Sequence, residues 1–179
     1  MSEKVQLSKI IILRGNSGSG KTTTAKALQK RLGHGTMLLS QDVIRREMLY
    51  VKDGPDTPAV NLLIDLVQYA KKQCSIVILE GILSATWYAE LFERIKTEYQ
   101  DQIYAYYFDL PFEETLQRHK QKPNAKEFGE AEMRRWWKEK DFIHGITESI
   151  LTKDQSQEEI LEQIVKNSNL ENRVAQNKV

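Results

Sequence analysis

Short apolar runs alternate with longer amphipathic stretches along the chain. The runs predict five strands, at residues 9–13, 36–40, 75–81, 103–109 and 146–151. The first, third and fourth runs are nearly continuous in apolarity and rich in β-branched or aromatic residues. Strands that are covered on both faces have this composition, so we expect helices on both sides of the sheet.

Between the runs, apolar residues recur at helical spacing, which predicts helices that pack into the core. One helix covers residues 21–32, and Thr57-Pro58 is typical of the N-cap and first position of another. The apolar stripes are Ala25, Leu28 and Leu32; Val60, Leu63, Val67 and Ala70; Tyr88, Phe92, Ile95 and Tyr99; and Ile160, Leu161, Ile164 and Val165. The alternation predicts an α/β fold, a five-stranded parallel sheet with helices on both faces.

The chain has 179 residues, which fits a single domain over 1–179. Two polar segments interrupt the pattern: a turn-rich loop at 50–58, and a charged excursion between the fourth and fifth strands. Together with the helix expected after it, the excursion predicts a helical lid over about 119–137. The polar tail at 168–179 predicts disorder.

Residues 15–22 match the pattern G-x-x-x-x-G-K-[ST] between a predicted buried strand and a predicted helix. Glycines let backbone N–H groups approach phosphate closely, and the helix adds its positive N-terminal end. Lys21 would bridge the β- and γ-phosphates of ATP, and Thr22 would bind Mg²⁺. The predicted nucleotide-binding residues of the loop are Gly15, Asn16, Ser17, Gly18, Ser19, Gly20, Lys21, Thr22 and Thr23. A glycine-rich turn without a ligand is the alternative, and the strand–loop–helix context argues against it.

Two acidic residues follow predicted strands, at the edge of the sheet where open α/β folds bind ligands. Asp42 comes after the second strand with Arg45 three residues on, a pair suited to accept a hydroxyl proton and to bind a polar or anionic acceptor. Glu80 ends the third strand and could hold a water on Mg²⁺, or serve as or assist the base. The structural alternatives are an N-cap for Asp42 and an unliganded strand end for Glu80.

The segment 109–137 carries basic residues expected to act on the phosphates. Arg118 falls near the end of one predicted helix, and Arg134 and Arg135 lie on a second helix next to a tryptophan pair. This composition is typical of a lid that closes over ATP and places cations on the transferring phosphoryl group. A solvated helical hairpin with its tryptophans in the core is the alternative.

The P-loop, the Asp42-x-x-Arg45 pair and the run FDLPFEETLQRH into the lid resemble the small P-loop kinases. The likeness is to the branch of polynucleotide kinases, chloramphenicol phosphotransferase and the zeta toxins, and it spans most of residues 8–151. It implies that Asp42 is the general base, that Arg45 binds the acceptor, and that Arg118 lies near the adenine or the phosphates. Glu80-Gly81 resembles the uridine-kinase form of the Walker B end.

The chain departs from this family in the lid. Polynucleotide kinases carry a lid arginine about one turn past the position matched to Arg118, where this chain has Lys122. Lysine keeps the charge but lacks the planar fork of arginine. The candidates for the lid cation are Lys122, Lys126, Arg134 and Arg135, and the sequence does not choose between them.

The 26 Lys and Arg residues nearly balance the 25 Asp and Glu residues, and a net charge of +1 argues against nucleic acid as a partner. Cys74 is the single cysteine, so an internal disulfide is excluded and a reducing, cytoplasmic location is expected. No apolar segment is suited to secretion or long enough to span a bilayer, so no membrane partner is expected. His34, His119 and His144 have no metal-ligand spacing.

The leading hypothesis is an ATP-dependent kinase that uses ATP and Mg²⁺ to phosphorylate a hydroxyl of a small molecule. Its predicted site residues are Lys21, Asp42 and Arg118 for catalysis, Asp42, Arg45 and Glu80 for the acceptor, and Thr22 and Glu80 for the metal. Nucleosides, sugars and antibiotic-like compounds are all open as acceptors, and the oligomeric state is undetermined. Trp87 and Tyr88 are candidate stacking surfaces or core residues. The alternatives are a nucleotide-binding switch that acts through a protein partner, and a polynucleotide 5′-hydroxyl kinase.

Overall fold

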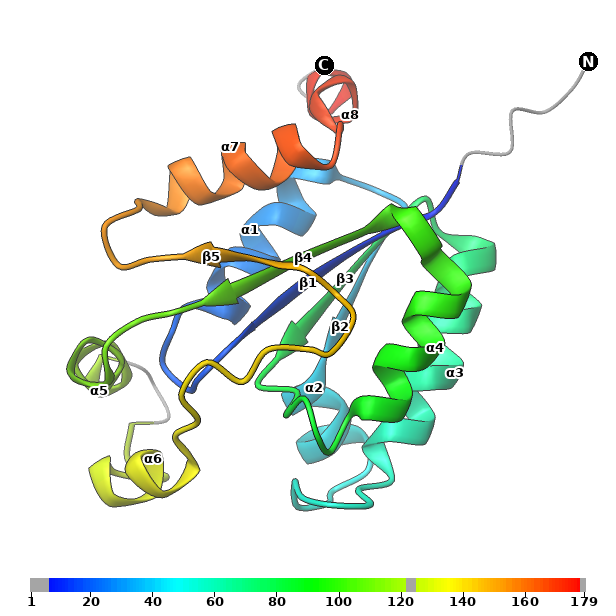
Figure 1. The fold of residues 1–179 in the computed structure, drawn as a ribbon. Coiled ribbons are helices and arrows are strands. Elements are labelled where there is room, and N and C mark those ends of the chain that lie inside the picture. The colour runs from blue at the N-terminus through cyan, green and yellow to red at the C-terminus, as the bar shows by residue number, and fades with distance from the viewer. Residues whose placement is uncertain (1–6, 122–124, 178–179) are drawn as a thin grey trace, which may run out of the picture.

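Five parallel strands form one twisted sheet in the order β2-β3-β1-β4-β5 (Figure 1). The structure is a computed structural model that describes residues 7–121 and 125–177. The strands are β1 (Lys9–Gly15), β2 (Thr36–Ser40), β3 (Ile76–Gly81), β4 (Ile103–Phe108) and β5 (Glu148–Leu151). All five predicted strands are present with bounds shifted by at most a few residues, and the predicted α/β fold class is confirmed.

Helices cover both faces of the sheet (Figure 1). They are α1 (Lys21–Leu32), α2 (Gln41–Val43), η1 (Ile44–Met48, a π-helix), α3 (Ala59–Gln73), α4 (Ala89–Tyr99), η2 (Gln100–Gln102, a 3₁₀ turn), α5 (Phe112–Lys120), α6 (Glu130–Trp136), α7 (Gln157–Asn167) and α8 (Glu171–Gln176). In the part of the chain that the structure describes, no helix is long and apolar enough to cross a membrane.

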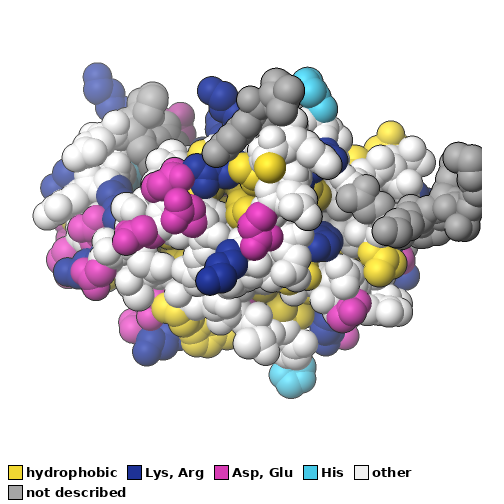
Figure 2. All heavy atoms as spheres, turned by 90° about the horizontal axis from the view of Figure 1, so that it is seen from above, with side chains coloured by type: hydrophobic (Ala, Val, Ile, Leu, Met, Phe, Trp, Pro, Cys, Tyr) yellow, Lys and Arg dark blue, Asp and Glu magenta, His cyan; other side chains and the backbone are white. Residues whose placement is uncertain are grey.

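The central strands are apolar on both sides because each side packs against a helical layer. Ile10 and Ile12 of β1 belong to the core shared with α3 and α4, whereas Ile11 and Leu13 belong to the core shared with α1 and α7. A strand in this position buries every side chain, which is why its sequence shows no alternation of apolar and polar residues. On the outer surface, basic and acidic side chains are interspersed over the face seen in Figure 2.

The buried side chain of Arg14, the last residue before Gly15, connects parts of the fold that are distant in sequence. It donates two hydrogen bonds, of 3.1 and 2.9 Å, to the carbonyl oxygen of Leu83 after β3. It also forms ion pairs with Asp141 at 3.1 Å and with Glu148 of β5 at 2.8 Å. Arg14 and Glu148 are 0% and 1% exposed, so both charges depend on each other for compensation.

The tail expected to be disordered contains the ordered helix α8. Leu170 is buried, and Arg173 donates to the carbonyl oxygen of Leu32 at 3.0 Å. Asn177 donates to the carbonyl oxygen of Arg31 at 3.2 Å. The last carbonyl groups of α1 have no hydrogen-bond partner within their own helix. The hydrogen bonds that they accept from Arg173 and Asn177 attach the C-terminal segment to the end of α1. Residues 178–179 lie outside the described residues.

Arg14→Met should lower the free energy of unfolding by about 3–5 kcal/mol, because it leaves the buried Glu148 carboxylate without its counter-charge. Urea unfolding followed by circular dichroism measures this change. The control is Arg31→Met, which removes an ion pair with Glu158 that is 25% and 60% exposed. That pair should contribute less than about 1 kcal/mol. A loss below about 1 kcal/mol in the Arg14 variant would contradict the central role of this side chain.

Candidate active site

The loop between β1 and α1 carries the glycine pattern that predicts a phosphate site. Gly15, Gly18 and Gly20 have φ values of 145°, 81° and 99°, a region that residues with a Cβ rarely adopt. A Cβ at Gly15 would lie 2.8 Å from the carbonyl oxygen of Phe108, and one at Gly18 would lie 2.5 Å from that of Thr115. Close packing therefore requires glycine at two positions of the loop, and Gly20 starts α1 in a left-handed conformation.

Lys21, Thr22 and Glu80 come together at the start of α1. The Lys21 ammonium is buried and donates to the carbonyl oxygen of Asn16 at 2.7 Å and to the Ser19 hydroxyl at 3.2 Å. Thr22 Oγ1 donates to Glu80 Oε2 at 3.1 Å, and the Ser40 hydroxyl donates to Glu80 Oε1. Glu80 is 2% exposed and does not line the large cavity described below.

The Thr22–Glu80 pair fits a magnesium site by its chemistry. A hydroxyl and a carboxylate are the hard oxygen donors that Mg²⁺ prefers, and Mg²⁺ commonly binds through one or two carboxylates together with phosphates and waters. Within residues 7–121 and 125–177 no three His, Cys, Asp or Glu side chains gather as a metal-binding group. A cation at this place would therefore need ligands from a bound phosphate as well.

Asp42 lies on α2 and is held by two arginines of η1. Its Oδ1 atom is 2.8 Å from an Arg45 guanidinium nitrogen and 3.5 Å from Nε of Arg46. The π-helical turn, closed by Leu49 N–H to the Ile44 carbonyl oxygen at 3.0 Å, places both arginines on the side of Asp42. Such turns are frequent at functional sites. The predicted Asp42–Arg45 pairing is present.

Gln41, which is next to Asp42 in the sequence, forms a partly buried hydrogen-bond network with Asp53 and Tyr88. The Gln41 amide donates to Asp53 at 2.9 Å and to the Tyr88 hydroxyl at 2.8 Å, and Tyr88 donates to Asp53 at 2.7 Å. Gln41 also accepts from the N–H of Leu83 at 2.9 Å, beside Gly81, where a Cβ would collide with it. Burial raises the pKa of the Tyr88 hydroxyl above its ordinary value, and the hydrogen bond to Asp53 raises it further. Tyr88 is thus a core residue and not a stacking surface.

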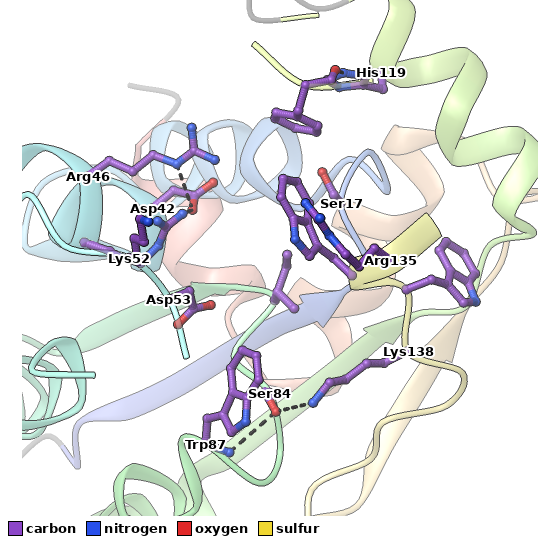
Figure 3. A pocket seen from close by; sticks show the side chains of 15 residues that line it. Ser17, Asp42, Arg46, Lys52, Asp53, Ser84, Trp87, His119, Arg135 and Lys138 are labelled. Carbon is purple, nitrogen blue, oxygen red and sulfur yellow. Dashed lines mark hydrogen bonds and ion pairs between the residues drawn. The ribbon is translucent and has the colours of Figure 1, made fainter. Parts of the chain in front are cut away.

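A cavity of about 630 Å³ joins the phosphate loop to Asp42 (Figure 3). Small-molecule sites typically have this size. Its lining residues are Ser17, Asp42, Arg45, Arg46, Lys52, Asp53, Ile82, Ser84, Trp87, His119, Phe128, Arg135, Trp136, Trp137 and Lys138. Five of these are Lys or Arg and two are Asp, so the wall is more basic than the chain as a whole.

The lid candidates differ in where the structure places them. Arg135 lines the cavity, whereas Arg134 pairs with Glu130 at 2.8 Å and lies over the ring of Phe112. Lys126 is exposed and is not part of the lining, and Lys122 lies outside the described residues. Of the described candidates, Arg135 is therefore the one best placed to reach a phosphate.

Arg118, which the family resemblance placed near the adenine or the phosphates, contacts the phosphate loop. It donates to the carbonyl oxygen of Ser19 at 3.2 Å and pairs with Glu114 at 2.7 Å. Its guanidinium is also 3.6 Å from the position that a Cβ on Gly20 would take. The guanidinium of Arg118 on α5 therefore lies beside the phosphate loop.

Sequence reasoning missed several residues of the site. Asp53, Ser84 and Lys138 line the cavity, and Arg14 binds the carbonyl oxygen of Leu83, which lies between the lining residues Ile82 and Ser84. A charged residue within a run that otherwise reads as a buried strand was the signal for Arg14. Lys138 gave no signal, because it stands in a segment where basic and acidic residues are equally frequent.

Comparison with known proteins agrees with this fold. The model of the AAA_33 family, described as an AAA domain, matches residues 10–143, and the chain belongs to this family. A comparison with curated proteins gave no significant match. The solved structures include several P-loop small-molecule kinases, so the predicted resemblance to that group is confirmed at the level of the fold.

Three solved structures with this fold illustrate the likeness. The tunicamycin resistance protein of Deinococcus radiodurans is 18% identical, with a TM-score of 0.62 over 91% of this chain and 96% of that one. The APS kinase of Mycobacterium tuberculosis, solved with AMPPNP and APS, is 18% identical, with a TM-score of 0.60 over 89% and 96%. The shikimate kinase of Acinetobacter baumannii, solved with shikimate, is 21% identical, with a TM-score of 0.57 over 93% and 96%.

Gly18→Ala should lower the free energy of unfolding by about 2–4 kcal/mol, because the new Cβ meets the Thr115 backbone in a left-handed conformation. The matched control is Gly129→Ala, where a Cβ meets only the Glu132 side chain, at 3.6 Å. Urea unfolding should show a change below about 0.5 kcal/mol for the control. Equal effects of the two substitutions would mean that the loop can relax around a side chain.

Tyr88→Phe should lower the free energy of unfolding by about 1 kcal/mol at neutral pH, through loss of the hydroxyl hydrogen bonds. Above about pH 10 the unfolded tyrosine ionises while the buried one keeps its proton, so the wild type loses stability as pH rises. The variant lacks this loss, and the difference between the two proteins should shrink by up to about 1.4 kcal/mol per pH unit. Urea unfolding at a series of pH values tests this, with exposed Tyr50→Phe as the control at neutral pH. A difference that stays constant with pH contradicts the buried hydroxyl.

Proposed function

We propose that the protein is an ATP-dependent kinase that transfers the γ-phosphoryl group of ATP·Mg to a hydroxyl of a small molecule. The observation that carries this proposal is that one cavity is lined both by Ser17 of the phosphate loop and by Asp42 with Arg45. A phosphoryl group held by the loop and an acceptor held by Asp42 would share this space. Solved relatives support the arrangement, since the APS kinase structure contains AMPPNP together with APS.

Asp42 has the geometry of a general base. Both arginine contacts are made by Oδ1, and within the described residues Oδ2 makes no hydrogen bond or ion pair. The side chain is 64% exposed, so Oδ2 is accessible to an acceptor. In the transfer, the acceptor O–H gives its proton to Oδ2, its oxygen forms a bond to the γ-phosphorus, and the bond between that phosphorus and the β–γ bridging oxygen breaks to release ADP.

The remaining residues bind and orient the phosphates. Backbone N–H groups of the loop and the N-terminus of α1 form the anion site, with Lys21 on the β- and γ-phosphates. Thr22 and Glu80 would hold Mg²⁺, which supplies neutralisation of the phosphate charge when bound. Arg118 beside Ser19, and Arg135 from the lid, add positive charge where negative charge develops in the transition state.

The Arg45 and Arg46 pair serves the acceptor side. Arg45 is largely buried and is anchored to Asp42 and to the carbonyl oxygen of Val51. Its fixed guanidinium would keep the carboxylate in one orientation and would contact a polar acceptor directly. Arg46 also pairs with Glu127 of the lid at 3.2 Å, so acceptor binding and the lid are connected.

Asp42→Asn should lower kcat by about 100-fold to 10,000-fold with little change in KM for ATP, because only the proton acceptor is lost. ADP release from ATP·Mg is measured across nucleosides, sugars, antibiotics and short 5′-hydroxyl oligonucleotides. Exposed Glu47→Gln, the same chemical change on η1, is the control and should retain activity. If no acceptor stimulates turnover and both proteins hydrolyse ATP equally, the protein acts as a nucleotide switch. Stimulation by the oligonucleotides alone would identify a polynucleotide kinase.

A further inference from the structure

Lys138 follows the lid helix α6 and reaches into the cavity opposite Asp42 (Figure 3). We propose that it binds an anionic group of the acceptor, so that the substrate is a small alcohol bearing an oxyanion such as a carboxylate or phosphate. This inference rests on the proposed kinase function and specifies the acceptor of the same site.

The ammonium of Lys138 is surrounded by groups that do not neutralise it. Its Nζ donates to the Ser84 hydroxyl at 2.6 Å and lies 4.6 Å from the centre of the Trp87 ring. Ser84 is 1% exposed and Lys138 itself is half-buried. Among the described residues no carboxylate forms an ion pair with Lys138. A partly desolvated ammonium in this environment favours an anion as its next ligand.

The backbone of Lys138 is fixed to the phosphate loop. The Asn16 amide donates to the Lys138 carbonyl oxygen at 2.7 Å, and the Lys138 N–H donates to Asn16 Oδ1 at 3.0 Å. Three residues further on, Asp141 pairs with Arg14 and accepts from the N–H of Ala85 at 2.8 Å. The ammonium therefore has a defined position relative to both the phosphate loop and the wall after β3. A group bound there would set the distance between the acceptor and the γ-phosphoryl.

The charges of the cavity divide between its two ends. Near Asp42, the two arginines of η1 are already paired with carboxylates, which suits the hydroxyl end of an acceptor. On the opposite wall, the Lys138 ammonium contacts the hydroxyl of Ser84 and the face of the Trp87 ring. The Ser84 hydroxyl oxygen also accepts from the backbone N–H of Trp87. The geometry thus orients an acceptor with its hydroxyl toward Asp42 and its anionic group toward Lys138.

The test uses acceptors in matched pairs that differ in one charged group: nucleosides against their 5′-monophosphates, and aldoses against their aldonic acids. The first pair examines phosphate and the second carboxylate. Acceptor-dependent ADP release gives KM for each compound. Calorimetry with AMP-PNP and Mg²⁺ present gives its affinity without turnover. We expect the anionic member of one pair to bind at least about 10-fold more tightly than the neutral member.

Lys138→Met should raise KM and Kd for that anionic acceptor by about 10-fold to 100-fold, with the neutral partner and ATP changed by less than about threefold. The control is Lys140→Met, two residues away, exposed and not part of the cavity lining. The anion site is overturned if the wild type uses the neutral member of each pair as well as, or better than, the anionic member. It is also overturned if Lys138→Met raises KM for ATP and not KM for the acceptor. Either result leaves the proposed kinase function intact. Anion binding that depends on Lys138 without any turnover supports the site and contradicts the kinase. Absence of binding by all compounds overturns the inference.

Discussion

The buried charge of Arg14 is the constraint on which the site depends. It stands at the end of β1, directly before the phosphate loop, and its guanidinium is satisfied by Leu83, Asp141 and Glu148 together. A buried cation is tolerated only when all of its partners are in place. Arg14 therefore fixes how four segments lie relative to one another: the end of β1, the loop after β3, the segment around Asp141 and the strand β5.

The segment expected to form a lid is connected to the phosphate loop at two points. On its entry side, Arg118 of α5 contacts the carbonyl oxygen of Ser19, and Gly18 packs against the backbone of Thr115. On its exit side, Asn16 forms paired hydrogen bonds with Lys138. The two contacts hold the helices α5 and α6 close to the phosphate loop.

The region around Asp42 is organised differently, by side-chain networks in place of a backbone cradle. Asp42 is oriented by Arg45 and Arg46 across a π-helical turn, and the segment carrying it is braced by the Gln41–Asp53–Tyr88 network. Such networks depend on exact partners, whereas a phosphate loop depends on backbone conformation. The two halves of the cavity wall are therefore held in place by different kinds of interaction.

The sequence by itself determined the strands, the helices and the phosphate loop, because local periodicity and glycine spacing encode them directly. It also placed Asp42 and Glu80 at the carboxyl ends of β2 and β3, where the structure has them. The tertiary structure decided what local pattern does not carry: the helix α8 in the polar tail, which contacts the end of α1, and the choice between core and stacking surface for Tyr88. It also decided the entry of Lys138 into the cavity, since residues more than a hundred positions apart, such as Asn16 and Lys138, meet only after the sheet has formed.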